Sequence, residues 1–220
     1  MSDFINVTGT VKVKPKLRGV SHQIAFFAAL AAGGVLVFVA STPRTMWAGL
    51  VYALSLAGMF GISAAYHRPT WSVAARSRMR RLDHAGIFLL IAGSYTPVCV
   101  LTDNFTLLTI AWAGAALGLL HAAFVHQAFR RLNAAIYVVL GCAALPVLPS
   151  LLAVLGPARV ALLLAGGAVY ILGAVVYALR WPDPAPAVFG YHEIFHLMVI
   201  IASVLHFAVM LGLVRGDGRL

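Results

Sequence analysis

The amino-acid sequence predicts an all-α, polytopic membrane protein: a bundle of seven transmembrane helices with its N-terminus in the cytoplasm. Of its 220 residues, 62% are hydrophobic and 10% are charged, and the mean hydropathy is +0.94. Soluble domains are typically about 45–50% apolar and about 25% charged. Apolar runs of about 20 residues, the length needed to cross the hydrocarbon core, occupy most of the chain. The positive charges between these runs are distributed unequally, which indicates the orientation.

The apolar runs follow one another through residues 21–213 with short connections, and some contain prolines, as at Pro97, Pro146 and Pro149. Membrane helices tolerate proline because neighbouring helices and hydroxyl groups satisfy the freed backbone groups. Residues 1–20 are basic and lack the apolar core and cleavage site of a signal peptide. We therefore expect a cytoplasmic tail over 1–20, a short external tail over 214–220, and spans at roughly 21–41, 46–66, 84–102, 106–126, 133–154, 160–179 and 191–213.

The orientation follows from the Lys and Arg residues outside the spans. With seven spans, 12 of the 16 lie on the side of the N-terminus and 4 on the opposite side. Positive charge marks the cytoplasmic face, so this distribution places the N-terminus inside and the C-terminus outside. The same positions account for a net charge of +10 without a nucleic-acid partner. Cys99 and Cys142 fall within apolar runs, so the sequence does not indicate a disulfide scaffold.

Five polar residues are predicted to meet at the cytoplasmic boundary. Ser63 and His67 lie one helical turn apart at the end of the second span, which runs inward. Asp83 lies at the start of the third span, and His192 and His196 open the seventh; both of these spans run outward. Residues four apart share a helix face, so both pairs project together. The topology thus brings three helices, distant in sequence, to one leaflet.

Three imidazoles and a carboxylate favour a catalytic zinc site. Such sites use three protein ligands and a water, and zinc lowers the pKa of that water to about 7. We expect His67, His192 and His196 to bind the metal and Asp83 to orient the water and take its proton. Ser63 could hydrogen-bond a ligand, the water or a developing oxyanion. Considered singly, each histidine could be an ordinary boundary residue, and Asp83 could pair with Arg80 and Arg81 instead.

Residues 192–196 also read H-E-x-x-H, the signature of zinc metalloproteases, in which Glu193 would be the general base. We consider this alternative weaker, because the chain lacks the second motif of intramembrane metalloproteases and His67 supplies a third ligand. Glu193 projects about 100° around the helix from His192. It could therefore face lipid headgroups or Arg180.

The remaining histidines are not expected to bind the metal. His206 lies about 15 Å along the helix from His196, too far to share an ion, and we expect it to be buried and hydrogen-bonded. His84 is interpreted as a boundary residue or as support for the site. Three others lie near predicted span ends without a partner at metal spacing, and we interpret them as boundary residues: His22, His121 and His126.

Four segments together resemble a known family: S-A-A-Y-H at 63–67, D-H-A-G-I-F at 83–88, I-A-G-S-Y-T-P at 91–97 and G-Y-H-E-I-F-H at 190–196. In this order they are similar to the bacterial hemolysin III proteins of the progestin and adipoQ receptor family, which includes the adiponectin receptors. The resemblance implies a seven-helix bundle in the bacterial inner membrane, N-terminus inside. It also implies zinc held by three histidines, with Asp83 at the zinc-bound water and Ser63 beside it; the histidines are His67, His192 and His196.

The family's relation to alkaline ceramidases implies a zinc-dependent hydrolase that cleaves a membrane lipid at an amide bond. The principal alternative is a non-enzymatic receptor or sensor in which zinc joins the second and seventh helices. A pore-forming cytolysin ranks lower, because such a toxin normally needs export and a soluble state.

Overall fold

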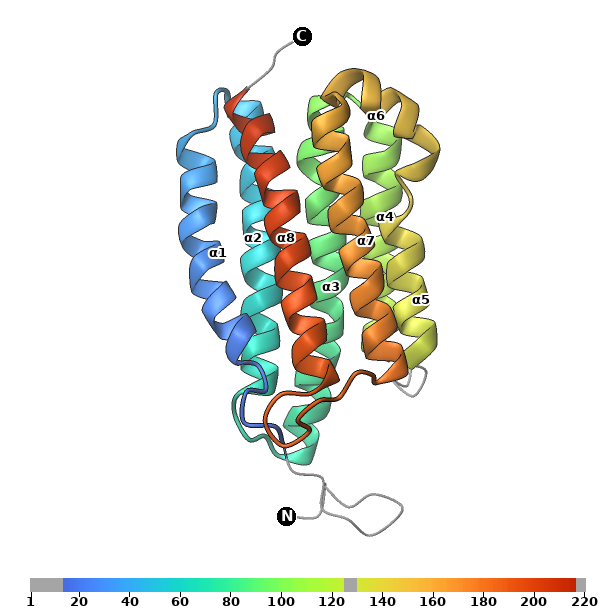
Figure 1. Cartoon of the computed structure of the whole chain (residues 1–220). Coiled ribbons are helices and arrows are strands. Elements are labelled where there is room, and N and C mark those ends of the chain that lie inside the picture. The colour runs from blue at the N-terminus through green and yellow to red at the C-terminus, as the bar shows by residue number, and fades with distance from the viewer. Residues whose placement is uncertain (1–13, 125–129, 217–220) are drawn as a thin grey trace.

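The computed structural model describes residues 14–124 and 130–216, and within them the protein is helical, without strands (Figure 1). Seven segments of these residues are long and apolar enough to cross a membrane, which confirms the predicted fold class. One of them, Leu132–Leu155, combines two helices and a short 3-10 turn. The elements are α1 (Val20–Phe38), α2 (Pro43–His67), α3 (Val73–Leu101), α4 (Phe105–Phe124), α5 (Arg130–Gly141), the turn Leu145–Val147, α6 (Leu148–Leu155), α7 (Pro157–Leu179) and α8 (Tyr191–Arg215).

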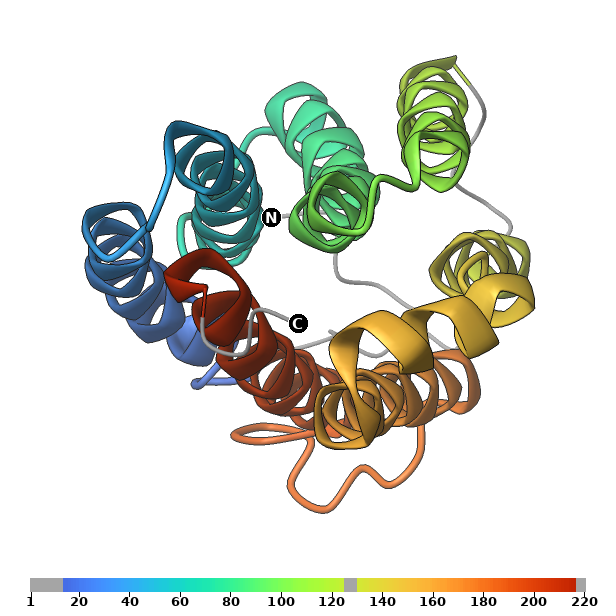
Figure 2. The same cartoon turned by 90° about the horizontal axis from the view of Figure 1, so that it is seen from above.

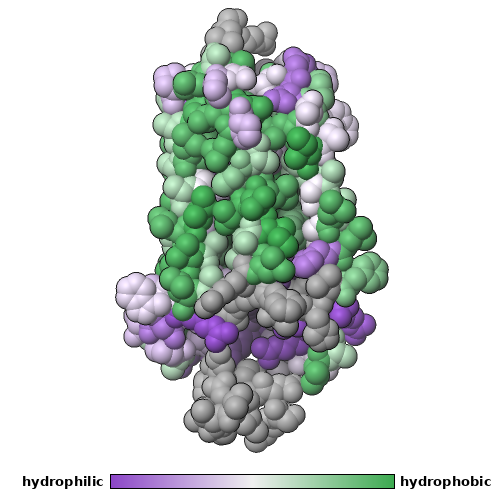
Figure 3. Space-filling model, turned by 90° about the vertical axis from the view of Figure 1, so that its right-hand side faces the viewer, coloured by the Kyte–Doolittle hydropathy of each residue, from purple (hydrophilic) through white to green (hydrophobic). Residues whose placement is uncertain are grey.

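The helices stand side by side and, seen from above, surround a common interior (Figures 1 and 2). Helices α1 to α4 pack each against the next in chain order, and α8 packs against α1, α2, α3 and α7. The last helix therefore closes the bundle against the first three. The face shown in Figure 3 is largely apolar along the length of the bundle, and hydrophilic residues gather towards its ends. Such a surface suits contact with lipid, as expected for a multi-pass membrane protein.

The fifth predicted span is not one continuous helix. The chain leaves α5 after Gly141, makes the 3-10 turn, and resumes as α6. Pro146 lies in the turn and Pro149 in the first turn of α6. Proline lacks a backbone N–H and its ring clashes with the preceding turn, so a helix interior tolerates it poorly. In contrast, Pro97 lies inside the continuous helix α3.

Helix α3 begins at Val73, eleven residues before the predicted span at 84. The hydroxyl of Ser72 accepts a hydrogen bond from the backbone N–H of Ala75 at 3.4 Å and caps this start. The segment between the second and third predicted spans, which carries five arginines, is therefore mostly helix. Hydropathy locates the apolar part of a helix, whereas hydrogen bonding and caps decide where the helix begins.

The helices that carry the predicted site residues meet at one end of the bundle, here called the site end. Helix α2 ends there, and α1, α3 and α8 begin there (Figure 1). Which side of a membrane this end faces stays a prediction from the Lys and Arg distribution. The predicted tails over 1–20 and 214–220 fall largely outside the described residues.

Candidate metal centre

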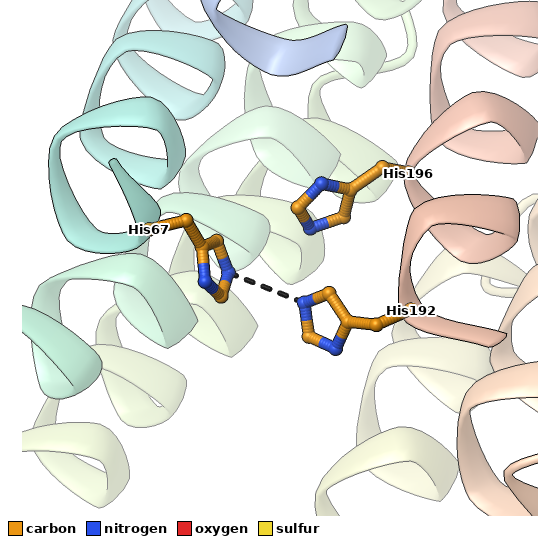
Figure 4. A group of neighbouring side chains, drawn as sticks. All are labelled: His67, His192 and His196. Atoms are coloured by element: carbon orange, nitrogen blue, oxygen red, sulfur yellow. Dashed lines mark hydrogen bonds between the residues drawn. The ribbon is translucent and has the colours of Figure 1, made fainter. Parts of the chain in front are cut away.

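Three imidazoles converge at the site end. His67 is the last residue of α2, and His192 and His196 lie on the first two turns of α8. The Nε2 atoms of His67 and His192 are 3.2 Å apart, and one ring nitrogen from each of the three lies within 4.8 Å of the others (Figure 4). His67 and His196 are buried, with 8% and 2% of their surfaces exposed, and His192 is half-buried. The three residues are close enough to hold a metal ion, as the topology predicted.

The position of His67 depends on a close approach by the chain before α1. Gly19 adopts a φ of 78°, and a Cβ atom at this residue would lie 2.6 Å from the Cβ of His67. Both the left-handed backbone and the lack of space favour glycine here. The end of α2 is thus packed directly against the start of α1.

Asp83 and Ser63 lie beside the imidazoles, as the sequence predicted. An oxygen of the half-buried Asp83 carboxylate is 3.9 Å from Nε2 of His67. Ser63 is buried one turn before His67, and it lines the same cavity as Asp83. Among the described residues, Asp83 forms no ion pair with Arg80 or Arg81. All five residues chosen from the sequence therefore gather at one place, although their chemical roles stay predictions.

His22 also belongs to this cluster, contrary to our interpretation of it as a boundary residue. Its side chain is 2% exposed, and its Nδ1 lies 2.9 Å from the Ser63 hydroxyl. Its ring stacks on that of His196, with centroids 3.8 Å apart and planes 10° from parallel. A signal for this placement existed: the first span starts at the same end as the third and seventh, so the topological argument that placed Asp83 applies equally to His22.

Glu193 does not face the three histidines. Its carboxylate is 2% exposed, accepts a hydrogen bond from Nε of Arg18 at 2.5 Å, and accepts another from the backbone N–H of Gly190 at 2.8 Å. The expectation that it faces headgroups or Arg180 is wrong. Its two oxygens thus link the chain before α1 to the start of α8. Because both oxygens already accept hydrogen bonds, the general-base role that a metalloprotease requires is disfavoured.

The other histidines lie apart from the three imidazoles. Nε2 of His206 is 3.1 Å from the Leu163 carbonyl, so the expected hydrogen bond is confirmed, and the residue is half-buried. His121 is 2.9 Å from the side chain of Asn133 and links α4 to the helix after it. His84 is half-buried beside Asp83. The prediction for His126 lies outside the described residues.

A cavity of about 1140 Å³ adjoins the cluster and extends into the bundle. Cavities that bind small molecules typically have about 300–1,000 Å³, so this one can hold a large ligand. At the site end its walls include the three imidazoles and Asp83. Deeper, the lining is largely apolar, with a few hydroxyl groups such as those of Ser94 and Tyr170. The three imidazoles therefore lie where a polar mouth meets an apolar interior.

Comparison with known proteins assigns the chain to a family. A family model described as haemolysin-III related matches residues 10–207. The chain belongs to this family. Hemolysin-3 of Bacillus cereus is 29% identical over 199 residues, which cover 87% of this chain and 88% of that protein. The resemblance stated from the sequence motifs is therefore confirmed.

Two eukaryotic relatives extend the comparison. A heptahelical transmembrane protein of rice (Oryza sativa subsp. japonica) is 31% identical over 188 residues, covering 74% of this chain and 80% of that protein. Progestin and adipoQ receptor-like protein 1 of Caenorhabditis elegans is 29% identical over 184 residues, covering 72% of this chain and 42% of that protein. The haemolysin-III related chain thus shares its membrane domain with receptor-like proteins.

Proposed function

We propose that this haemolysin-III related protein is a zinc-dependent hydrolase that cleaves an amide bond in a membrane lipid. The observation that carries the proposal is the arrangement of His67, His192 and His196 around one point, with the Asp83 carboxylate 3.9 Å from His67. The large cavity adjoining these residues supports a lipid substrate, because its deeper lining is mostly apolar.

The donor set fits zinc. Two nitrogen ligands at 2.0–2.1 Å with a tetrahedral angle between them are about 3.3 Å apart, close to the 3.2 Å between His67 and His192. His196 supplies the third imidazole, and one of its ring nitrogens faces the other two rings (Figure 4). Three protein ligands with a water in the fourth position are what a catalytic zinc site requires. Imidazole also binds other divalent transition metals, but a site of three histidines and one open position is typical of zinc.

Each nearby side chain has a role in this proposal. A bound zinc ion would polarise the lipid carbonyl and supply a nucleophile from water at neutral pH. Asp83 would accept the proton of the attacking water and pass it to the amide nitrogen as that group leaves. Ser63, whose hydroxyl is held by His22 at 2.9 Å, would donate a hydrogen bond to the developing oxyanion. The site requires no contribution from Glu193.

The same proposal includes a location. With the N-terminus inside, the site end would face the cytoplasm of a bacterium, and the protein would reside in the inner membrane. A lipid would then reach the three imidazoles from the cytoplasmic leaflet.

The purified full chain should hydrolyse lipid amides, tested on a panel of N-acyl lipids beginning with a ceramide. Asp83→Asn should reduce the rate by about 10²–10⁴-fold, while zinc content and the unfolding temperature stay unchanged. Asp103→Asn is the control; this residue forms an ion pair with Arg44 far from the histidines. Equal rates for Asp83→Asn and the wild type would contradict the role of Asp83.

The alternative is a receptor or sensor in which zinc joins α2 and α8. The observation in its favour is that His67 lies on α2 whereas the other two histidines lie on α8. It predicts that removing zinc lowers the unfolding temperature and that no lipid amide is hydrolysed. The hydrolase proposal fails in that case.

A further inference from the structure

One face of α3 lines the cavity from the site end inward. Arg76, Arg80 and Asp83 follow one another along this face at intervals of four and three residues, and Ile87 and Leu90 continue it. Residues three or four apart lie on the same side of a helix. From the site end inward, this face of α3 therefore carries two cationic side chains, then the carboxylate of the candidate site, and then apolar side chains.

Two arginines on the same turns do not line the cavity. Arg78 and Arg81 belong to the same basic segment but are absent from the cavity wall. A general excess of positive charge at a membrane face explains arginines of this kind. It does not explain why two of them are placed at the mouth of an internal cavity beside a candidate active site.

The segment before α1 adds positive charge to the same mouth. Lys14 and Arg18 both line the cavity, and Lys14 donates a hydrogen bond to the Arg68 carbonyl at 2.8 Å. Arg18 is already paired with Glu193. Burial, together with the nearby charges of Arg68, Arg18 and Arg76, lowers the pKa of Lys14. Among the described residues that line this mouth, the four cationic side chains of Lys14, Arg18, Arg76 and Arg80 outnumber the two carboxylates, those of Asp83 and Asp183, so the potential there is positive.

The spacing relates these cations to the candidate reaction centre. At 1.5 Å per residue, Arg80 lies about 4.5 Å and Arg76 about 10.5 Å along the helix axis from Asp83. An anionic group bound by Arg80 would be a few bonds away from a carbonyl placed beside the three histidines, and Arg76 would contact the same group from the outer side. The apolar side chains beyond Asp83 would face the opposite end of the same molecule.

We propose that the basic mouth, formed by Lys14, Arg76 and Arg80, binds the anionic headgroup of a single-chain amphiphile. The substrate class is then a lipid amide with a carboxylate or phosphate close to the amide bond. The amide is taken from the proposed function, whereas anion binding does not depend on turnover. Guanidinium groups suit this task because they bind carboxylate and phosphate through two parallel hydrogen bonds.

Equilibrium binding of two radiolabelled amides that share one acyl chain tests this proposal: N-palmitoylglycine carries a carboxylate and N-palmitoylethanolamine a neutral hydroxyl. The full-length protein in detergent should bind N-palmitoylglycine at least about tenfold more tightly, as expected for one charge-assisted contact. The double variant Arg76→Ala/Arg80→Ala should lose this preference. Arg78→Ala/Arg81→Ala should keep it, although it removes the same charge from the same turns.

Because the readout is binding, the preference should persist in His192→Ala, even if no variant hydrolyses either amide. If no amide is hydrolysed, the proposed function fails, but a preference for N-palmitoylglycine would still support the anion site. Size-exclusion profiles and unfolding temperatures of the two double variants should match, which separates lost recognition from misfolding. Three results would overturn the proposal: no preference in the wild type, the same loss in Arg78→Ala/Arg81→Ala, or competition by N-acetylglycine at the concentration at which N-palmitoylglycine competes.

Discussion

The imidazole of His22 lies flat against that of His196, with ring centroids 3.8 Å apart. The same ring reaches the Ser63 hydroxyl through Nδ1 at 2.9 Å. His22 therefore touches a candidate metal ligand and a candidate oxyanion donor at once. It comes from α1, which contributes none of the three imidazoles. The first helix thus supports a site built from the second, third and eighth.

His22→Ala should weaken zinc binding by about 10–100-fold, the usual effect of losing a residue that orients a metal ligand. The variant removes both the stacked ring and the partner of Ser63. Competition with a graded series of zinc chelators measures the affinity. His121→Ala is the matched control, because His121 bonds Asn133 away from the site. Equal zinc affinities for His22→Ala and the wild type would show that the stack has no positioning role.

Gly19→Ala should lower both zinc affinity and stability. The substitution strains a backbone at φ 78° and drives a Cβ into that of His67. Gly156→Ala is the control: its φ of 77° carries a similar penalty, but nothing lies within 4 Å of the added Cβ. Each variant should be destabilised by about 1–3 kcal/mol, the cost of an unfavourable backbone conformation. Only Gly19→Ala should release zinc more readily, and equal zinc affinities in the two variants would contradict the packing argument.

The ion pair between Arg18 and Glu193 should be structural. Arg18→Ala leaves a carboxylate with a 3% exposed side chain unpaired, and breaking such a pair costs about 3–5 kcal/mol, with the lower end expected here. Lys16→Ala, at an exposed residue nearby, should be nearly neutral. Denaturant unfolding in detergent measures the stability of both variants.

Glu193→Gln should keep lipid hydrolysis, because the Glu193 carboxylate pairs with Arg18 and does not face the three histidines. Loss of hydrolysis together with retained zinc would instead favour Glu193 as a general base.

Much of the fold and the site was predictable from the sequence. Hydropathy identified seven spans, and their alternating direction placed His67, Asp83 and His192 at one end. The prediction of which residues share one end succeeded because a segment that crosses a membrane can run in only one of two directions. The sequence could not place the start of α3, since the helix extends past its apolar part to the cap at Ser72. It also could not show the break in the fifth span, because two prolines are compatible with either a kink or a turn.

The contacts of His22 and Glu193 were missed for a different reason. Both depend on how the start of α1 packs against α8, and hydropathy does not specify which faces of two helices meet. Glu193 was judged from its angle to His192 alone, whereas its partner Arg18 lies 175 residues away. Topology can assign a residue to one end of a bundle, but contacts between helices decide its neighbour.

The most direct test of the central claim is the zinc content of the purified full-length protein, measured by elemental analysis. We expect about one zinc ion per chain in the wild type and in His206→Ala, whose histidine bonds the Leu163 carbonyl instead. We expect little zinc in His67→Ala and in His192→Ala, each of which removes one of three proposed ligands. Equal zinc in the wild type and in both of these variants would contradict a metal site formed by His67, His192 and His196.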